Sequence, residues 1–115
     1  MSAPPRLKSG LWVEAYLRRS AVAGINGAII HKGDADAGSV FVVLNRLDGR
    51  HDLLGPAPGA AYDDNGDRRF TKMLSDAAWL DVSAAFAKRR SSDPDLWLLE
   101  VELREGLAGL QQVEE

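Results

Sequence analysis

The sequence predicts an α+β domain with a mainly antiparallel five-stranded sheet, a central meander and two packed helices, in the order α-β-β-β-β-α-β. Two observations support this prediction. Short runs of β-branched and aromatic residues alternate with turns rich in glycine and aspartate, which is typical of strands. Two other stretches carry apolar residues at helical spacing. The 115 residues are the length of one domain.

The amino-acid composition excludes several kinds of protein and of functional site. With 14 basic and 17 acidic residues the net charge is −3, which does not favour nucleic-acid binding. The absence of cysteine excludes disulfides, thiol catalysis and thiolate metal sites. No apolar run approaches the roughly 20 residues that span a bilayer, and the N-terminus lacks the apolar part of a secretory signal. We therefore expect a cytoplasmic protein without a membrane segment.

The chain is expected to divide into three parts. Residues 1–8, with two consecutive prolines, predict a flexible lead-in. Residues 9–106 hold the regular patterns and predict a single α+β domain. Residues 107–115 are weakly patterned and predict a weakly ordered C-terminal tail.

The first helix is expected from about Gly10 to Ala23, with Ser9 as its N-cap and Gly24 just beyond its end. Residues 10–17 also alternate between apolar and polar types, so a strand is the alternative there. The helix is favoured because residues 15–23 lack a β-branched run. Its apolar residues would form two faces, namely Leu11, Ala15 and Val22, and Val13, Leu17 and Ala21.

The following stretch predicts a hairpin around which the domain packs. Gly27–Lys32 and Ser39–Arg46 are strand-like, and the glycine- and aspartate-rich Gly33–Gly38 would connect them as antiparallel neighbours. The second strand is apolar on both faces, so we place it centrally. Asp48-Gly49 predicts a two-residue turn into a third strand at Arg50–Leu54.

The rest of the chain gives a loop, a short strand, a helix and a final strand. Proline and glycine mark the loop, and Asp93-Pro94-Asp95 ends the helix. Trp79, Val82 and Phe86 lie on one predicted helix face. The expected ranges are Gly55–Asp67 for the loop, Arg68–Met73 for the short strand, Ala78–Ser91 for the helix and Leu96–Arg104 for the last strand.

Several segments together resemble one family of small alphaproteobacterial proteins, catalogued as domain of unknown function 1491. The resemblance spans roughly Leu7 to Gly106 and implies a single-domain bacterial cytoplasmic protein, with no activity or site residue to carry over. The segments are Leu11-Trp12-Val13 with Leu17-Arg18-Arg19, Gly33–Gly38, Asn45–Gly49, Gly55-Pro56-Ala57 and Asp93–Trp97.

Four aspartates form the first candidate site. If the last strand runs antiparallel to the first, Asp93 and Asp95 approach Asp34 and Asp36. Four carboxylates could bind a divalent cation such as Mg²⁺, Ca²⁺ or Mn²⁺. Turn chemistry is the alternative explanation and the one favoured, because aspartate in loops commonly binds the nearby backbone.

Other candidates are single residues. His31 lies two residues before the acidic turn and is a candidate general base, although no nucleophile motif accompanies it. A structural role is therefore the favoured explanation for His31. No cofactor motif is evident. Candidate binding-surface residues are Trp12, Tyr16, Arg19 and Arg69.

These observations favour a small non-enzymatic binding or interaction module that uses an available sheet edge or exposed tryptophan. A protein partner or self-association would follow from such a surface. The alternative is a divalent-metal-dependent hydrolase built on the acidic turns. A third, weaker hypothesis is a nucleic-acid accessory protein using the arginine pairs.

Overall fold

The computed structural model describes residues 7–59 and 61–113, and the part of the predicted lead-in before Leu7 lies outside them. The α+β class is confirmed, with two helices and a six-stranded sheet. The helices are α1 (Ser9–Val22) and α2 (Trp79–Ser92), and the strands are β1 (Gly27–His31), β2 (Val40–Asn45), β3 (His51–Pro56), β4 (Arg69–Ala77), β5 (Trp97–Glu102) and β6 (Gln111–Gln112).

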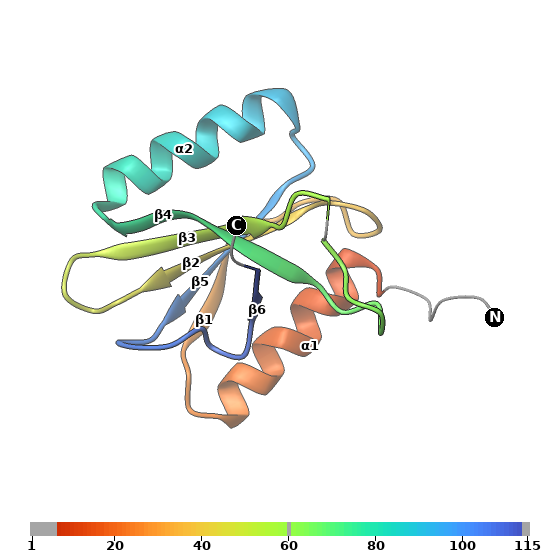
Figure 1. Ribbon diagram of the computed structural model, residues 1–115, viewed down its shortest axis with the longest axis horizontal. Helices are drawn as coiled ribbons and strands as arrows, with labels where there is room; N and C mark the ends of the chain where they lie inside the picture. Colours follow the sequence, from red (N-terminus) through yellow and green to blue (C-terminus); the bar gives the residue numbers. More distant parts are fainter. Residues whose placement is uncertain (1–6, 60, 114–115) are drawn as a thin grey trace.

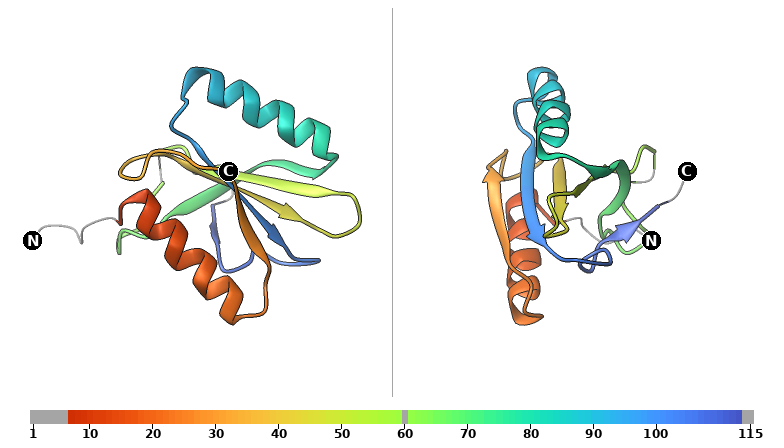
Figure 2. Two further views of the ribbon diagram at one scale, coloured as in Figure 1. Left: turned by 180° about the vertical axis from the view of Figure 1, so that it is seen from behind. Right: turned by 90° about the vertical axis from the view of Figure 1, so that its left-hand side faces the viewer.

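The sheet has the order β1-β5-β2-β3-β4-β6 and separates the two helices (Figure 1). The pairs β2–β5 and β4–β6 are parallel and the others antiparallel, so the sheet is mixed. Seen edge-on, α1 and α2 lie on opposite faces (Figure 2). No helix among the described residues combines the length and apolar character needed to cross a membrane.

The predicted hairpin between β1 and β2 is wrong, because β5 lies between these two strands. β5 pairs antiparallel with β1 and parallel with β2. The physical reason is burial: the first five residues of β2 are buried, and such a strand is stable only with a neighbour on each side. The apolar β5 takes that place and leaves the exposed β1 at the sheet edge.

The predicted hairpin between β2 and β3 is confirmed, but its turn is longer than two residues. Asn45 pairs with His51, and Arg46 N–H donates to Arg50 C=O across the loop. Leu47 and Gly49 both have positive φ, 65° and 85°. β4 then continues the antiparallel order, and it extends to Ala77, beyond the expected end at Met73.

Helix α1 is confirmed, and the strand alternative is wrong. Gly24, with φ of 78°, follows its C-terminal end as predicted. The predicted N-cap is wrong: Lys8 precedes the helix, and Ser9 turns its hydroxyl to Gly38 C=O instead of to the helix backbone.

The predicted apolar faces of α1 are correct only at Val13, which is buried, and at Leu17, which packs partly buried against the core. Leu11 and Val22 are exposed, whereas the buried side of the helix is formed by Ser9, Trp12, Val13, Tyr16 and Ser20. Two aromatic rings give that side enough apolar surface to tolerate the two serines.

Each face of the sheet carries its own core. On the α1 face, Trp12 and Tyr16 pack with Phe70, Trp97 and alternate residues of β2 and β5. On the α2 face, Val82 and Phe86 pack with Phe41 and other residues of the same strands. The predicted helix face of α2 is therefore buried at two of its three positions, while Trp79 stays 38% exposed.

The division of the chain at residues 8 and 106 stays a prediction. Within the described part of the tail, Leu110 is buried on the α1 face and β6 pairs with β4. Val113 N–H donates to Phe70 C=O, so this segment extends the sheet at the edge opposite β1.

Candidate functional site

The fold brings the two acidic turns together through their backbones. Because β1 and β5 are antiparallel, the loop after β1 lies beside the loop before β5, and Asp34 N–H donates to Asp95 C=O at 3.0 Å. The indole N–H of Trp97 donates to Asp34 C=O at 2.8 Å. The predicted proximity of the turns therefore arises from main-chain contacts.

Two of the four carboxylates bind the backbone of their own loops. Asp34 accepts the backbone N–H groups of Asp36 and Ala37, and Asp93 accepts that of Asp95. Asp36 lies 3.6 Å from the Lys8 ammonium in an exposed ion pair. In the described part of the chain, no three His, Cys, Asp or Glu side chains gather as metal ligands do. The cation site stays a prediction.

His31 lies at the end of β1 and contacts the backbone of the neighbouring strand. Its Nδ1 is 2.9 Å from Leu96 C=O, and its ring centroid is 5.8 Å from that of Phe86. These contacts tie the strand end to α2 and the start of β5. A role as general base stays untested.

Trp12 and Tyr16 are core residues. Their rings stack with centroids 5.0 Å apart, and both side chains are buried. The Tyr16 hydroxyl donates to Ala108 C=O at 2.9 Å, and burial raises the pKa of Tyr16. Tyr16 and Arg19 line a pocket of about 260 Å³ between α1 and the loop before β6.

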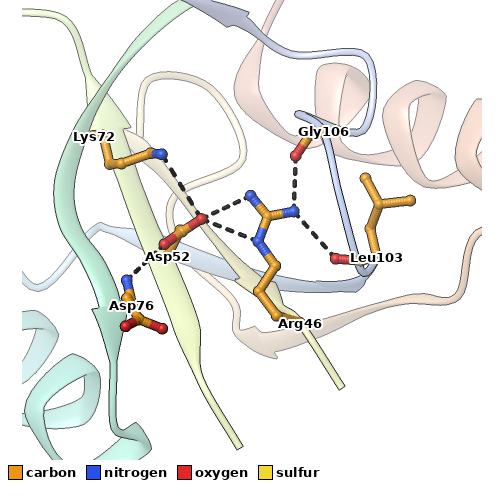
Figure 3. Close-up of polar contacts among 6 residues, drawn as sticks. All are labelled: Arg46, Asp52, Lys72, Asp76, Leu103 and Gly106. Atoms are coloured by element: carbon orange, nitrogen blue, oxygen red, sulfur yellow. Dashed lines mark hydrogen bonds and ion pairs between the residues drawn. The ribbon is translucent and has the colours of Figure 1, made fainter. Parts of the chain in front are cut away.

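A charged network crosses the sheet near the β2–β3 turn (Figure 3). The Arg46 guanidinium donates through Nε and Nη2 to Asp52 Oδ2, at 3.0 and 2.7 Å. Its Nη1 donates to the carbonyls of Leu103 and Gly106, and the other Asp52 oxygen accepts Asp76 N–H. The network therefore joins the β2–β3 loop, β3, β4 and the loop after β5.

The Asp52 carboxylate is held charged by this network. Burial alone would raise its pKa, but the hydrogen bonds from Asp76 and Arg46, with attraction to Lys72, hold the pKa below its usual value. Both Asp52 oxygens are occupied by neighbours. The arrangement is that of a structural clamp.

The sequence analysis did not select Arg68 as a candidate site residue. Arg68 is 8% exposed, and its Nη2 donates to Leu7 C=O and the Ser9 hydroxyl at 3.3 and 3.0 Å. It lines a pocket of about 110 Å³ with Arg69, its partly exposed neighbour. Strand alternation could have indicated that the two neighbouring arginines differ in burial.

The β1 edge is the most exposed strand of the sheet. Four of its five residues are exposed, and Ile29 and Ile30 are 44% and 46% exposed. α1 packs beside it, where the Leu17 side chain approaches Gly27. A sheet edge with apolar side chains is a surface suited to pairing with another strand.

Comparison with known proteins places the chain in a family. The sequence profile described as "Protein of unknown function (DUF1491)" matches residues 7–111. The solution structure of protein Atu0922 from A. tumefaciens has 36% sequence identity and a TM-score of 0.83, with 96% of this chain and 98% of that chain covered.

Two structures of a DUF1491 family protein from Caulobacter crescentus CB15 are also similar. Its crystal structure has 26% identity and a TM-score of 0.76, covering 96% of this chain and 100% of that chain. An NMR structure has 27% identity and a TM-score of 0.73, covering 96% and 99%. Among curated proteins, no sequence matches. The chain belongs to the DUF1491 family, whose function is unknown.

Proposed function

We propose that this protein is a small non-enzymatic interaction module of the cytoplasm that acts through the open edge of β1. One observation carries the proposal: among the described residues, β1 has β5 on one side and no strand on the other. Its exposed Ile29 and Ile30 add apolar surface to that edge. Strand edges of this kind recruit a further strand by main-chain hydrogen bonds.

The register identifies which backbone groups are open. Glu102 N–H donates to Asn26 C=O, and hydrogen-bonded pairs alternate along an antiparallel ladder. Gly27 and Ile29 therefore direct their N–H and C=O groups away from β5. A partner strand would pair with these groups and cover the isoleucines.

The partner we propose is a second copy of the chain. Two β1 strands related by a two-fold axis would pair antiparallel and offer each other the same donors, acceptors and isoleucines. The register shift between Ile29 and His31 keeps the regular edge short. The β1–β1 contact is therefore small, and the fraction of dimer depends on the protein concentration.

Nuclear magnetic resonance on the ¹⁵N-labelled full chain tests this proposal. Raising the protein concentration is expected to shift the amide signals of Gly27–Ile30 progressively. Ile29→Pro removes an N–H that β5 does not use, so it should abolish these shifts while the rest of the spectrum stays native. Concentration-independent β1 signals in the native protein would reject the proposal.

A further inference from the structure

Arg68 is a buried cation that lies just before β4. Its guanidinium takes part in no ion pair among the described residues, and its Nε has no hydrogen-bond partner there. Both acceptors of the Nη2 hydrogen bonds, Leu7 C=O and the Ser9 hydroxyl, are neutral. Burying a charge that forms no direct ion pair is costly, and an anion in contact with the guanidinium would offset that cost.

The surroundings hold this cation in place. The guanidinium carbon lies 5.6 Å from the Trp12 ring centroid and 5.4 Å from that of Tyr62. Asp67 is near, but its Oδ1 accepts the Arg68 backbone N–H and the Trp12 indole N–H, at 2.9 and 3.3 Å. Burial lowers the pKa of Arg68, and attraction to Tyr62 and Asp67 offsets part of this.

A pocket lies beside this cation. Its volume is about 110 Å³, and its lining combines two arginines, a serine and apolar side chains. The polar members are Ser39, Tyr62, Arg68 and Arg69. The space suits the oxyanion end of a small ligand.

We infer that this pocket binds the phosphoryl group of a small metabolite, with Arg68 and Arg69 supplying the two positive charges. Guanidinium groups recognise phosphoryl oxygens through paired N–H donors, and two cations match the charge of a phosphate dianion. Trp12 and Tyr62 are positioning residues, because their rings fix the plane of the Arg68 guanidinium. The inference is independent of the β1 edge.

Titration of the full ¹⁵N-labelled chain with inorganic phosphate tests the inference. At constant ionic strength, the Nε–H signals of Arg68 and Arg69 are expected to move saturably with phosphate, and sodium chloride should not reproduce the movement. Acetate is the second probe, because it offers oxygens but one charge. Binding of acetate as tight as that of phosphate would overturn the phosphoryl assignment.

Two variants distinguish phosphate binding in the pocket from an effect of the protein's net charge. Arg69→Gln is the main variant, because Arg69 is partly exposed and its replacement should leave the fold intact. It is expected to weaken phosphate binding about tenfold through loss of a charge-assisted hydrogen bond. Arg18→Gln, an exposed position on α1, makes the same charge change and should leave binding unaltered.

Two results would overturn the proposal that this pocket binds phosphate. One is the absence of saturable movement of either arginine signal with phosphate. The other is equal weakening by Arg18→Gln and Arg69→Gln, which would assign any binding to net charge alone.

Discussion

Arg46 and Asp52 close the base of the β2–β3 hairpin, with Nη2 of the arginine 2.7 Å from Oδ2 of the aspartate. Both side chains are largely buried, at 15% and 9% exposure. The same arginine binds the carbonyls of Leu103 and Gly106, so one side chain connects the hairpin to the segment that leads to β6.

Asp52→Asn should destabilise the fold by about 2–3 kcal/mol, because it leaves the buried Arg46 charge without its counter-charge. Urea unfolding at neutral pH measures the loss. Asp76→Asn is the matched control, because the Asp76 carboxylate is 73% exposed in its pair with Arg50. It should cost less than about 1 kcal/mol. Equal losses from the two variants would contradict a buried clamp.

Lowering the pH should remove the stabilisation that the charged Asp52 carboxylate provides. The folded pKa of Asp52 is lowered, so its contribution is complete above the unfolded pKa of about 4 and is lost as pH falls through the folded value. The difference in unfolding free energy between the native protein and Asp52→Asn should therefore shrink from pH 7 towards about pH 2. A difference that stays constant over this range would show that Asp52 acts without its charge.

Leu47→Gly should stabilise the hairpin relative to Leu47→Ala by about 0.5–1 kcal/mol. Leu47 has φ of 65°, a conformation that glycine adopts without steric cost and alanine does not. Both variants remove the half-exposed side chain, so thermal unfolding of the pair isolates the backbone effect. Greater stability of Leu47→Ala would contradict this account of the turn.

Gly38→Ala should destabilise the protein by about 1–3 kcal/mol, because an added Cβ would collide with Asp95 C=O. The loops before β2 and β5 approach too closely for any side chain there. Gly10→Ala is the control, since its Cβ would lie 3.4 Å from Ala35 O. Chemical denaturation should show a clear loss for Gly38→Ala and a change within about 1 kcal/mol for Gly10→Ala.

Local patterns predicted most elements but not their pairing. The second helix and the β2–β3 hairpin followed from periodicity and from Asp48-Gly49, which are local signals. The insertion of β5 between β1 and β2 depends on contacts some 60 residues apart, such as Phe41 with Leu98. A glycine-rich connection between two apolar runs resembles a hairpin loop whether or not the strands pair.

The candidate site was less predictable for a related reason. Arg68 is more buried than Arg69 because it lies beside Trp12 and Ser9, which are some 55 to 60 residues away in the chain. Likewise the buried face of α1 combines two serines with two aromatic residues, which hides it from a search for aliphatic spacing. Tertiary contacts therefore determine both the burial of Arg68 and which face of α1 is buried.

Sedimentation velocity over a concentration series tests the interaction proposal most directly. The native protein should sediment faster as its concentration rises from about 10 µM to 1 mM, as expected of a weak dimer. Ile30→Lys, at the β1 edge, should stay monomeric, whereas Leu80→Lys, an equally charged change at the 80% exposed Leu80 of α2, should associate like the native protein. A constant sedimentation coefficient for the native protein, or undiminished association of Ile30→Lys, would contradict the account.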